Sequence, residues 1–374
     1  VLGIAYKNTE NIEDNVENDL IFTGLVGIID PPKENVDKSI AACKKAGIKV
    51  RMITGDHLKT AAAIAREIGI LTDGKVIDGE TLDKLSDEEY FEIVDDIQVY
   101  ARVKPEQKMR IVETLKQKGE IVSMTGDGVN DAPALTNASI GVAMGSGTDV
   151  AKESGDMIIQ DDNFETIVTA IREGRKIYDN IKRFVKFQVS TNVGAILTIV
   201  GTSIFMLPVP FNPVQLLWIN IVMDGPPAQT LGMEGSERNI MTRQPETGDI
   251  LNKKVLIKIF IAGLVMAIGS IALFSYKLAI GASQKQAMTV AFTLFVMYQL
   301  FNAYNSKSNS AKKSTYLYLA IIACFILQVL IVYIPELQII FRTTSIGLTD
   351  WILIFIIAAT ILVSNRIANK IVVE

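Results

Sequence analysis

The feature that most constrains this chain is a change in composition near residue 186. Charged residues are dense and interleaved before that point, whereas long apolar stretches follow it. A soluble domain of this size does not carry apolar stretches of that length, but a set of membrane-spanning helices does. We therefore expect one half of the chain to fold in water and the other half in a bilayer.

Several classes of function are excluded by residue content. The net charge of −4 gives no basic face for nucleic acid, so we expect no nucleic-acid partner. Cys43 and Cys324 are far apart and are interpreted as reduced, small apolar residues. His57 is the sole histidine, which excludes a His-rich metal site and an ordinary Ser-His-Asp or Cys-His arrangement. Any catalysis must therefore use carboxylates.

Short β-branched runs alternate with amphipathic helical segments in the first half. This pattern predicts a doubly wound α/β domain, in which crossover helices join the strands of a parallel sheet. Pro105 at a first helical turn and Gly47, Gly69 and Gly119 at helix exits mark the helix ends. The predicted strands are residues 21–29, 49–54, 98–103, 120–125, 139–143 and 157–160.

Carboxylates follow three of these strands on tight turns. The turns are Thr54-Gly55-Asp56, the run from Thr125 to Asp131, and Asp30-Pro31-Pro32. Ligands of such sheets sit at the carboxyl ends of the strands. Gly-rich turns free backbone N–H groups for a phosphate, and carboxylates four apart suit a hard divalent ion such as Mg²⁺. A lone turn of this kind is more often a solvated loop that uses Asp and Gly for geometry.

Taken together, these strings resemble a known family. MTGDGVNDAPAL, with ITGDH and ARVKPEQK ahead of it, is similar to the P-type ATPases within the haloacid-dehalogenase-like fold. The resemblance runs over nearly the entire chain. It implies a phosphorylation domain that works with Mg²⁺ and ATP.

The resemblance implies a role for each matching residue. Asp127 is the expected Mg²⁺ ligand, with Asp131 as a second ligand and Asn130 in support. Lys108 resembles the lysine that neutralises charge on an aspartyl phosphate. Without the resemblance, the favoured interpretation of Lys108 is a solvated lysine on a helix. Thr54 is expected to hydrogen-bond phosphoryl oxygens. Residues expected near the nucleotide and the hinge are Gly55, Asp56 and Asp30.

The family's nucleophile is an aspartate in a DKTGT motif, and no DKTGT occurs in this sequence. VLGIAYKN resembles only the last strand of the family's nucleotide-binding insertion. We therefore expect this chain to be the C-terminal fragment of a longer pump. Its expected partner is the missing N-terminal part of the same pump. The expected divisions are 1–20 for the end of the nucleotide-binding domain, 21–162 for the phosphorylation domain, 163–186 for a stalk helix and 187–374 for the membrane domain.

Six apolar stretches predict an all-α bundle of six transmembrane helices. The stretches are residues 187–207, 214–231, 255–276, 287–304, 316–334 and 351–367. With the first half in the cytosol, Lys and Arg concentrate at the cytosolic ends. The charged stretch before residue 187 predicts a stalk that continues into the first span. The alternative is an amphipathic helix on the membrane surface.

Polar residues inside the spans are costly and mark a transport path. We expect Asn220 and Asp224 to lie one helical turn apart on the same face, before a helix break at Gly225-Pro226-Pro227 that frees backbone carbonyls. Carboxylate, amide and carbonyl oxygens suit a hard cation. Asn192 and Gln229 are further candidate residues of the ion site. An asparagine inside a membrane also serves to hydrogen-bond one helix to another, which is the alternative role of Asn192.

The stretch LLWINIVMDGPPAQTLG resembles the sixth membrane helix of calcium pumps, and DGPPAQ is similar to the secretory-pathway calcium/manganese branch. Three positions differ from the two-calcium relatives, which implies one ion per cycle, held by Asn220 and Asp224 with Asn192 less secure. Gln229 occupies a place associated with manganese acceptance. The three differing positions are Ala195, Met223 and Gln299.

The leading hypothesis is a multi-pass pump that exports Ca²⁺ or Mn²⁺ through an aspartyl-phosphate intermediate. Its membrane would be the plasma membrane in a prokaryote or a Golgi-type membrane in a eukaryote. One alternative is a non-catalytic membrane fragment that binds a partner pump or lipid. Another is a tethered phosphatase, which the missing nucleophile disfavours.

Overall fold

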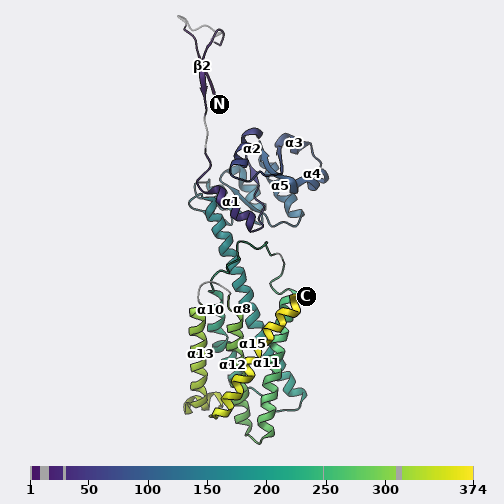
Figure 1. The fold of residues 1–374 in the computed structure, drawn as a ribbon, viewed down its shortest axis with the longest axis vertical. Helices are drawn as coiled ribbons and strands as arrows, with labels where there is room; N and C mark the ends of the chain where they lie inside the picture. The colour runs from purple at the N-terminus through teal and green to yellow at the C-terminus, as the bar shows by residue number, and fades with distance from the viewer. Residues whose placement is uncertain (1, 9–16, 28–30, 247, 309–313, 374) are drawn as a thin grey trace. The chain divides into compact units, whose positions relative to one another are not determined.

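The computed structural model describes residues 2–8, 17–27, 31–246, 248–308 and 314–373, with side chains described up to residue 364. The chain divides into two compact units (Figure 1). The first holds Val1–Lys44 and Lys49–Val168, and the second holds Lys45–Ile48 and Thr169–Glu374. Asp30 lies outside the described residues.

Two parallel sheets of three strands form the centre of the first unit. In one sheet β5 (Ile97–Ala101) lies between β3 (Met52–Ile53) and β4 (Lys75–Asp78). In the other, β7 (Ile140–Met144) lies between β6 (Ser123–Gly126) and β8 (Met157–Ile159). The parallel pairing agrees with the predicted α/β pattern, but the single predicted sheet is divided in two. Strand β4 was absent from the prediction.

The helices of the first unit end where their Pro and Gly residues indicate. Pro105 begins α5, because a missing N–H costs nothing in a first turn. Gly47, Gly69 and Gly119 follow helices at positive φ, a conformation that favours glycine. The helices are α1 (Val36–Lys45), α2 (Leu58–Glu67), α3 (Gly79–Lys84), α4 (Asp87–Ile93), α5 (Pro105–Gln117), α6 (Ala132–Asn137) and α7 (Asp149–Ser154), with short 3₁₀ turns η1 (Val94–Asp96) and η2 (Val129–Asp131).

The first two strands of the chain form a separate hairpin. β1 (Leu2–Tyr6) pairs antiparallel with β2 (Ile21–Val26), and nearly all their residues are exposed. The prediction that residues 21–29 join the parallel sheet is therefore wrong for the described residues 21–26. The apolar run IFTGLV carries no signal that distinguishes a buried parallel strand from one arm of a hairpin.

The second unit is helical. Its elements are α8 (Phe164–Ile204, which begins in the first unit), α9 (Pro213–Trp218), a π-helical segment η3 (Ile219–Met223), α10 (Gly225–Gly232), α11 (Lys253–Ala279), α12 (Gln284–Ser306), α13 (Thr315–Tyr333), α14 (Pro335–Phe341) and α15 (Leu348–Val373). The predicted stalk and first span form one continuous helix, α8.

Four helices in the described residues, α8, α11, α12 and α13, are long and apolar enough to cross a membrane. The apolar part of α15 described with side chains, Leu348–Ser364, is shorter. The second predicted span is divided among α9, η3 and α10. The structure therefore supports an integral membrane protein with four candidate spans, and the predicted number of six is not confirmed.

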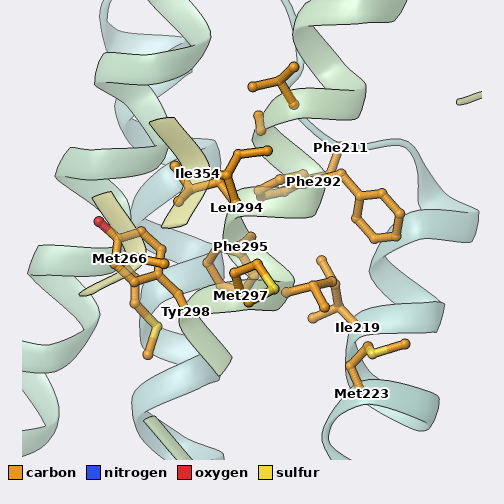
Figure 2. Close-up of a cluster of buried hydrophobic side chains, with 14 of the residues drawn as sticks. Phe211, Ile219, Met223, Met266, Phe292, Leu294, Phe295, Met297, Tyr298 and Ile354 are labelled. Carbon is orange, nitrogen blue, oxygen red and sulfur yellow. The ribbon is translucent and has the colours of Figure 1, made fainter. Parts of the chain in front are cut away.

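Helix α12 is the centre of the second unit. Its residues from Val290 to Leu300 are all buried, and α11, α13 and α15 pack against it. Figure 2 shows Ile219 and Met223 of η3 on one side of this apolar cluster and Met266 with Tyr298 on the other. Phe211 meets Phe295 edge to face with ring centroids 5.4 Å apart. Packing around α12 thus fixes the position of the broken helix.

The connection between α10 and α11 is held against α8 by polar contacts. Arg175 donates to the carbonyls of Ile240 and Arg243, both at 2.9 Å. Arg243 in turn forms an ion pair with Asp179 at 2.7 Å. Asn180 donates to the carbonyl of Glu234 at 3.0 Å. The bonds from Arg175 and Asn180 satisfy backbone carbonyls of a long connection that contains no helix or strand in its described residues.

Candidate functional site

Two loops at the strand ends of the first unit are tied together through the backbone. Thr54 follows β3, and its hydroxyl accepts from the N–H of Asp56 at 3.1 Å, which shapes the turn. Arg102 and Val103, which follow β5, donate to the carbonyls of Asp56 and Thr54 at 3.1 and 3.3 Å. The Thr54-Gly55-Asp56 turn is therefore fixed to the segment that leads into α5 and Lys108.

Lys108 and Asp131 form a close ion pair between α5 and the loop after β6. The Nζ of Lys108 lies 2.5 Å from Oδ1 of Asp131, and the side chains are 18% and 8% exposed. The other carboxylate oxygen accepts from the backbone N–H groups of Asp127 and Gly128, both at 3.2 Å. Asp131 thus closes the loop on itself and holds the lysine at the sheet edge.

Glycine is required beside this carboxylate. A Cβ at Gly126 would lie 2.8 Å from Cγ of Asp131. Real Cβ atoms do not approach other atoms so closely, so a side chain here would displace Asp131. The TGDGVND string therefore has a packing reason as well as a chemical one.

The electrostatics of Asp131 favour its charged form. Burial by itself raises the pKa, but the Lys108 ammonium and the N–H groups of Gly128 and Asp127 outweigh that effect. The pKa of Asp131 therefore lies below its ordinary value. A carboxylate that accepts from two backbone N–H groups and from the Lys108 ammonium is a fixed structural charge at this edge.

Asp127 differs from Asp131, although both were predicted as Mg²⁺ ligands. Its side chain is exposed and makes no hydrogen bond with the described residues, while its carbonyl accepts from Thr148 N–H at 2.8 Å. Asn130 is also exposed. A free carboxylate on a fixed backbone suits a hard cation that keeps several waters. Among the described residues, no three His, Cys, Asp or Glu side chains converge to hold a metal by themselves.

The second candidate site surrounds Asp224 at the end of η3. The N–H of Asp224 donates to the carbonyl of Ile219, five residues earlier, at 3.1 Å, which is the bond of a π-turn. The side chain is 0% exposed. Its Oδ1 accepts from Nε2 of Gln299 on α12 at 2.8 Å. This carboxylate is therefore buried beside an irregular helix.

Two oxygens at this position have no hydrogen-bond partner within the described part of the chain. They are Oδ2 of Asp224 and Oε1 of Gln299, both buried. Buried polar atoms without partners are rare because each costs about 1–3 kcal/mol. Oxygen atoms of this kind are the ligands that hard cations prefer.

The two prolines after Asp224 remove hydrogen-bond donors from the helix. Pro226 and Pro227 occupy the first turn of α10 and carry no N–H, so the carbonyl of Val222 receives neither an α-helical nor a π-helical bond. Cys324 donates its thiol to this carbonyl at 3.7 Å. The expectation of freed carbonyls is correct here, and Cys324, a free thiol, has a polar contact.

The prediction that Asn220 and Asp224 share a face is wrong. Asp224 is buried, whereas Asn220 is exposed. The π-turn widens the helix so that residue 224 stacks on residue 219 instead of 220. Asn192 on α8 and Gln229 on α10 are exposed as well.

Gln299 is the residue that the sequence reasoning did not assign to the site. From the sequence, Gln299 is only a substitution that removes a second ion site. The structure places it fully buried against Asp224, with a long contact to the Ile219 carbonyl at 3.5 Å. An amide in the otherwise apolar run FVMYQLF was the available signal.

Family models match both halves of the chain. Residues 5–139 match the model described as haloacid dehalogenase-like hydrolase. Residues 208–371 match the model described as cation transporting ATPase, C-terminus. These matches agree with the resemblance carried by the TGDGVND and DGPPAQ strings.

Curated relatives cover most of the chain. It is 40% identical to a calcium-transporting ATPase of Bacillus subtilis over 94% of this chain and 41% of the relative. It is 39% identical to calcium-transporting ATPase 1 of Saccharomyces cerevisiae over 98% of this chain and 40% of that protein. The human calcium-transporting ATPase type 2C member 1 is 38% identical over 94% of this chain and 40% of its own length. The chain thus spans about two fifths of the length of these relatives.

Proposed function

We propose that the two sites of this chain serve one ATP-driven pump. The premise is that the chain belongs to the family of cation-transporting ATPases. The pump would export Ca²⁺, or Mn²⁺, from the cytosol, one ion per cycle. The observation that carries the proposal is the buried Asp224 carboxylate, one oxygen held by Gln299 and the other without a partner in the described residues. Such a group in an apolar bundle is costly unless it binds something.

The strand-end site would serve phosphoryl transfer. Asp127 would hold Mg²⁺, with Asp131 behind it, and the ion would neutralise charge on the phosphoryl group. Lys108 would place a second positive charge there, oriented by its ion pair with Asp131. The hydroxyl of Thr54 would bind phosphoryl oxygens. Asn130, Gly55 and Asp56 remain candidates for supporting and nucleotide contacts, and Asp30 remains one outside the described residues.

The open edges of the two sheets support an aspartyl-phosphate route. Among the described residues, β3 pairs only with β5 and β6 only with β7, which leaves one edge of each strand unpaired. Ile53 of β3 and Val122 beside β6 pack into the same two apolar clusters. We propose that a further parallel strand fits between β3 and β6 and brings the nucleophilic aspartate to Lys108 and Asp127.

The exposed polar residues of the membrane helices fit the same proposal. Asn192, Asn220 and Gln229 are exposed on apolar helices, where contact with lipid would be unfavourable. We propose that further helices of the pump cover them and add an acidic ligand to the ion bound by Asp224. Gln229 would then influence the choice between Ca²⁺ and Mn²⁺.

The test uses the complete pump and measures phosphorylation from ATP while Ca²⁺ and Mn²⁺ are varied separately. The proposal predicts that either ion stimulates phosphorylation and that each competes with the other, with one ion bound per phosphorylated pump. Asp127→Ala should eliminate Mg²⁺-dependent turnover. A level of phosphorylation that does not change with either Ca²⁺ or Mn²⁺ would contradict the proposal.

A further inference from the structure

Helix α10 is short and carries the candidate ion ligand at one end. It comprises only Gly225–Gly232 and begins directly after Asp224. At about 1.5 Å per residue, its far end lies roughly 12 Å from Asp224. α10 packs against both α12 and α13 (Figure 1). A helix this short takes its position from its contacts, so the residues that fix its far end also affect Asp224.

The carboxylate of Glu234 fixes the far end of α10. Glu234 follows α10 closely and is 5% exposed. Its Oε2 accepts from the N–H of Ser308 at 3.1 Å and from the hydroxyl of Ser314 at 2.6 Å. Ser308 follows α12, and Ser314 directly precedes α13. The hydroxyl of Ser308 donates in return to the carbonyl of Gly235 at 3.0 Å. One carboxylate oxygen therefore joins the exit of α10 to the ends of α12 and α13.

The same two helices hold the other end of α10. Gln299 of α12 donates to Asp224, and Cys324 of α13 contacts the carbonyl of Val222. Between the two ends, Leu231 of α10 is fully buried in an apolar cluster that includes residues of α12 and α13. α10 therefore cannot change its tilt against α12 and α13 while all these contacts persist.

The backbone at Glu234 is bound to a third helix, α8. Asn180 of α8 is 2% exposed, and its Nδ2 donates to the carbonyls of Gly232 and Glu234 at 3.1 and 3.0 Å. α8 begins in the first unit, which holds the strand-end site. Glu234 thus meets α8 through its main chain, and the ends of α12 and α13 through its side chain.

We propose that Glu234 is a positioning residue for the ion site. This inference rests on the proposed function, because it takes Asp224 as the ligand of the transported ion. The Glu234 carboxylate holds α10 in one tilt, and that tilt directs the Oδ2 of Asp224, unpaired among the described residues, to the ion. Glu234 acts by accepting hydrogen bonds and does not bind the ion itself. Since Ser308 and Ser314 reach the same oxygen, the carbonyl oxygen of a glutamine can replace it.

The experiment measures phosphorylation of the complete pump from ATP as the Ca²⁺ concentration is varied. Glu234→Ala should raise the Ca²⁺ concentration for half-maximal phosphorylation about tenfold, as loss of a partner that orients a metal ligand does, and leave the maximal level unchanged. Glu234→Gln should stay within about twofold of the unaltered pump because it keeps the accepting oxygen. Ser314→Ala removes one of the two bonds, so an intermediate shift is expected even if Glu234→Ala does not fold. Glu237→Ala is the matched control, because Glu237 lies in the same connection but pairs with Arg183 of α8.

Amide hydrogen exchange of the full chain tests the same contact without ATP or a transported ion. The Ser308 amide should lose protection in Glu234→Ala and keep it in Glu234→Gln. Unchanged protection in Glu234→Ala would overturn the inference, as would an unchanged Ca²⁺ dependence in Glu234→Ala and Ser314→Ala. An equal shift in Glu237→Ala would also overturn it, and a shift in Glu234→Gln as large as in Glu234→Ala would assign the role to charge. These results refute the inference alone, whereas a pump whose phosphorylation does not respond to Ca²⁺ would refute the proposed function and the inference with it.

Discussion

Gln299 on α12 donates its side-chain amide to Oδ1 of Asp224 at 2.8 Å, and both side chains are fully buried. The bond crosses from the most buried helix of the bundle to the irregular end of η3. It fixes one oxygen of the carboxylate and leaves the other unpaired among the described residues. Gln299 thereby decides which way the candidate ion ligand points.

The first prediction concerns this orientation. In the complete pump, Gln299→Ala should weaken the apparent affinity for Ca²⁺ by about tenfold or more, because partners that orient a metal ligand contribute that much. The measurement is the Ca²⁺ concentration for half-maximal phosphorylation from ATP. Gln328→Ala is the matched control, since Gln328 is also fully buried in the bundle but donates to Thr293. An equal shift in both variants would show a general packing effect.

The second prediction concerns the ion pair of the strand-end loop. Lys108→Ala should leave the Asp131 carboxylate without its cation. Breaking a fully buried ion pair lowers the free energy of unfolding by about 3–5 kcal/mol. A smaller loss is expected here because the Lys108 side chain is 18% exposed. Hydrogen exchange of the full chain should show faster exchange in β6 and α6. Lys104→Ala is the control, because its pair with Asp83 is exposed. Unchanged exchange in Lys108→Ala would refute the structural role of the pair.

The third prediction is a pH dependence of the same loop. The folded-state pKa of Asp131 lies below its ordinary value of 3.8, so its contribution to stability is present above that pH. The contribution is lost as the pH falls through the lowered folded value. Protection of the Asp127 and Gly128 amides, corrected for intrinsic exchange, should therefore decrease below about pH 3.8. Asp131→Asn should remove this dependence, and persistence of it would assign the effect to another group.

The sequence predicts a structural element correctly where the contacts that form it join residues close together in the sequence. Pro105, Gly47, Gly69 and Gly119 marked helix ends correctly because capping is set by neighbours in sequence. Strand β2 is misplaced in the prediction because its apolar run fits a buried parallel strand as well as one arm of a hairpin with β1. The number of sheets also depends on long-range pairing that local pattern does not encode.

The sites show the same division. DGPPAQ predicts Asp224 as a candidate ligand beside a helix break, since a carboxylate before two prolines is a local signal. The exposed position of Asn220 was not anticipated, because the prediction assumed an α-helical turn where a π-turn exists. The Lys108 pair with Asp131 and the Gln299 bond to Asp224 join residues 23 and 75 positions apart, and only the folded chain shows them.

The fourth prediction concerns the buried ion pair between α11 and α15. Lys277 and Asp350 are 9% and 7% exposed in their side chains and lie 2.6 Å apart. Lys277→Ala should destabilise the bundle by about 3–5 kcal/mol because it leaves a buried charge unpaired. The measurement is thermal unfolding of the full chain in detergent. Lys277→Met with Asp350→Leu should recover most of the loss, whereas no recovery would indicate a role beyond charge pairing. Lys285→Ala, at an exposed lysine, is the control.

The most direct test of the transport account is the ion dependence of phosphorylation in the complete pump that carries Asp224→Ala. The account predicts that Ca²⁺ and Mn²⁺ no longer stimulate phosphorylation from ATP, because the buried carboxylate that binds the ion is gone. Asp350→Asn, which removes another buried carboxylate of the same bundle, should keep the ion response. An unchanged ion response in Asp224→Ala would contradict the account and remove Asp224 from the site.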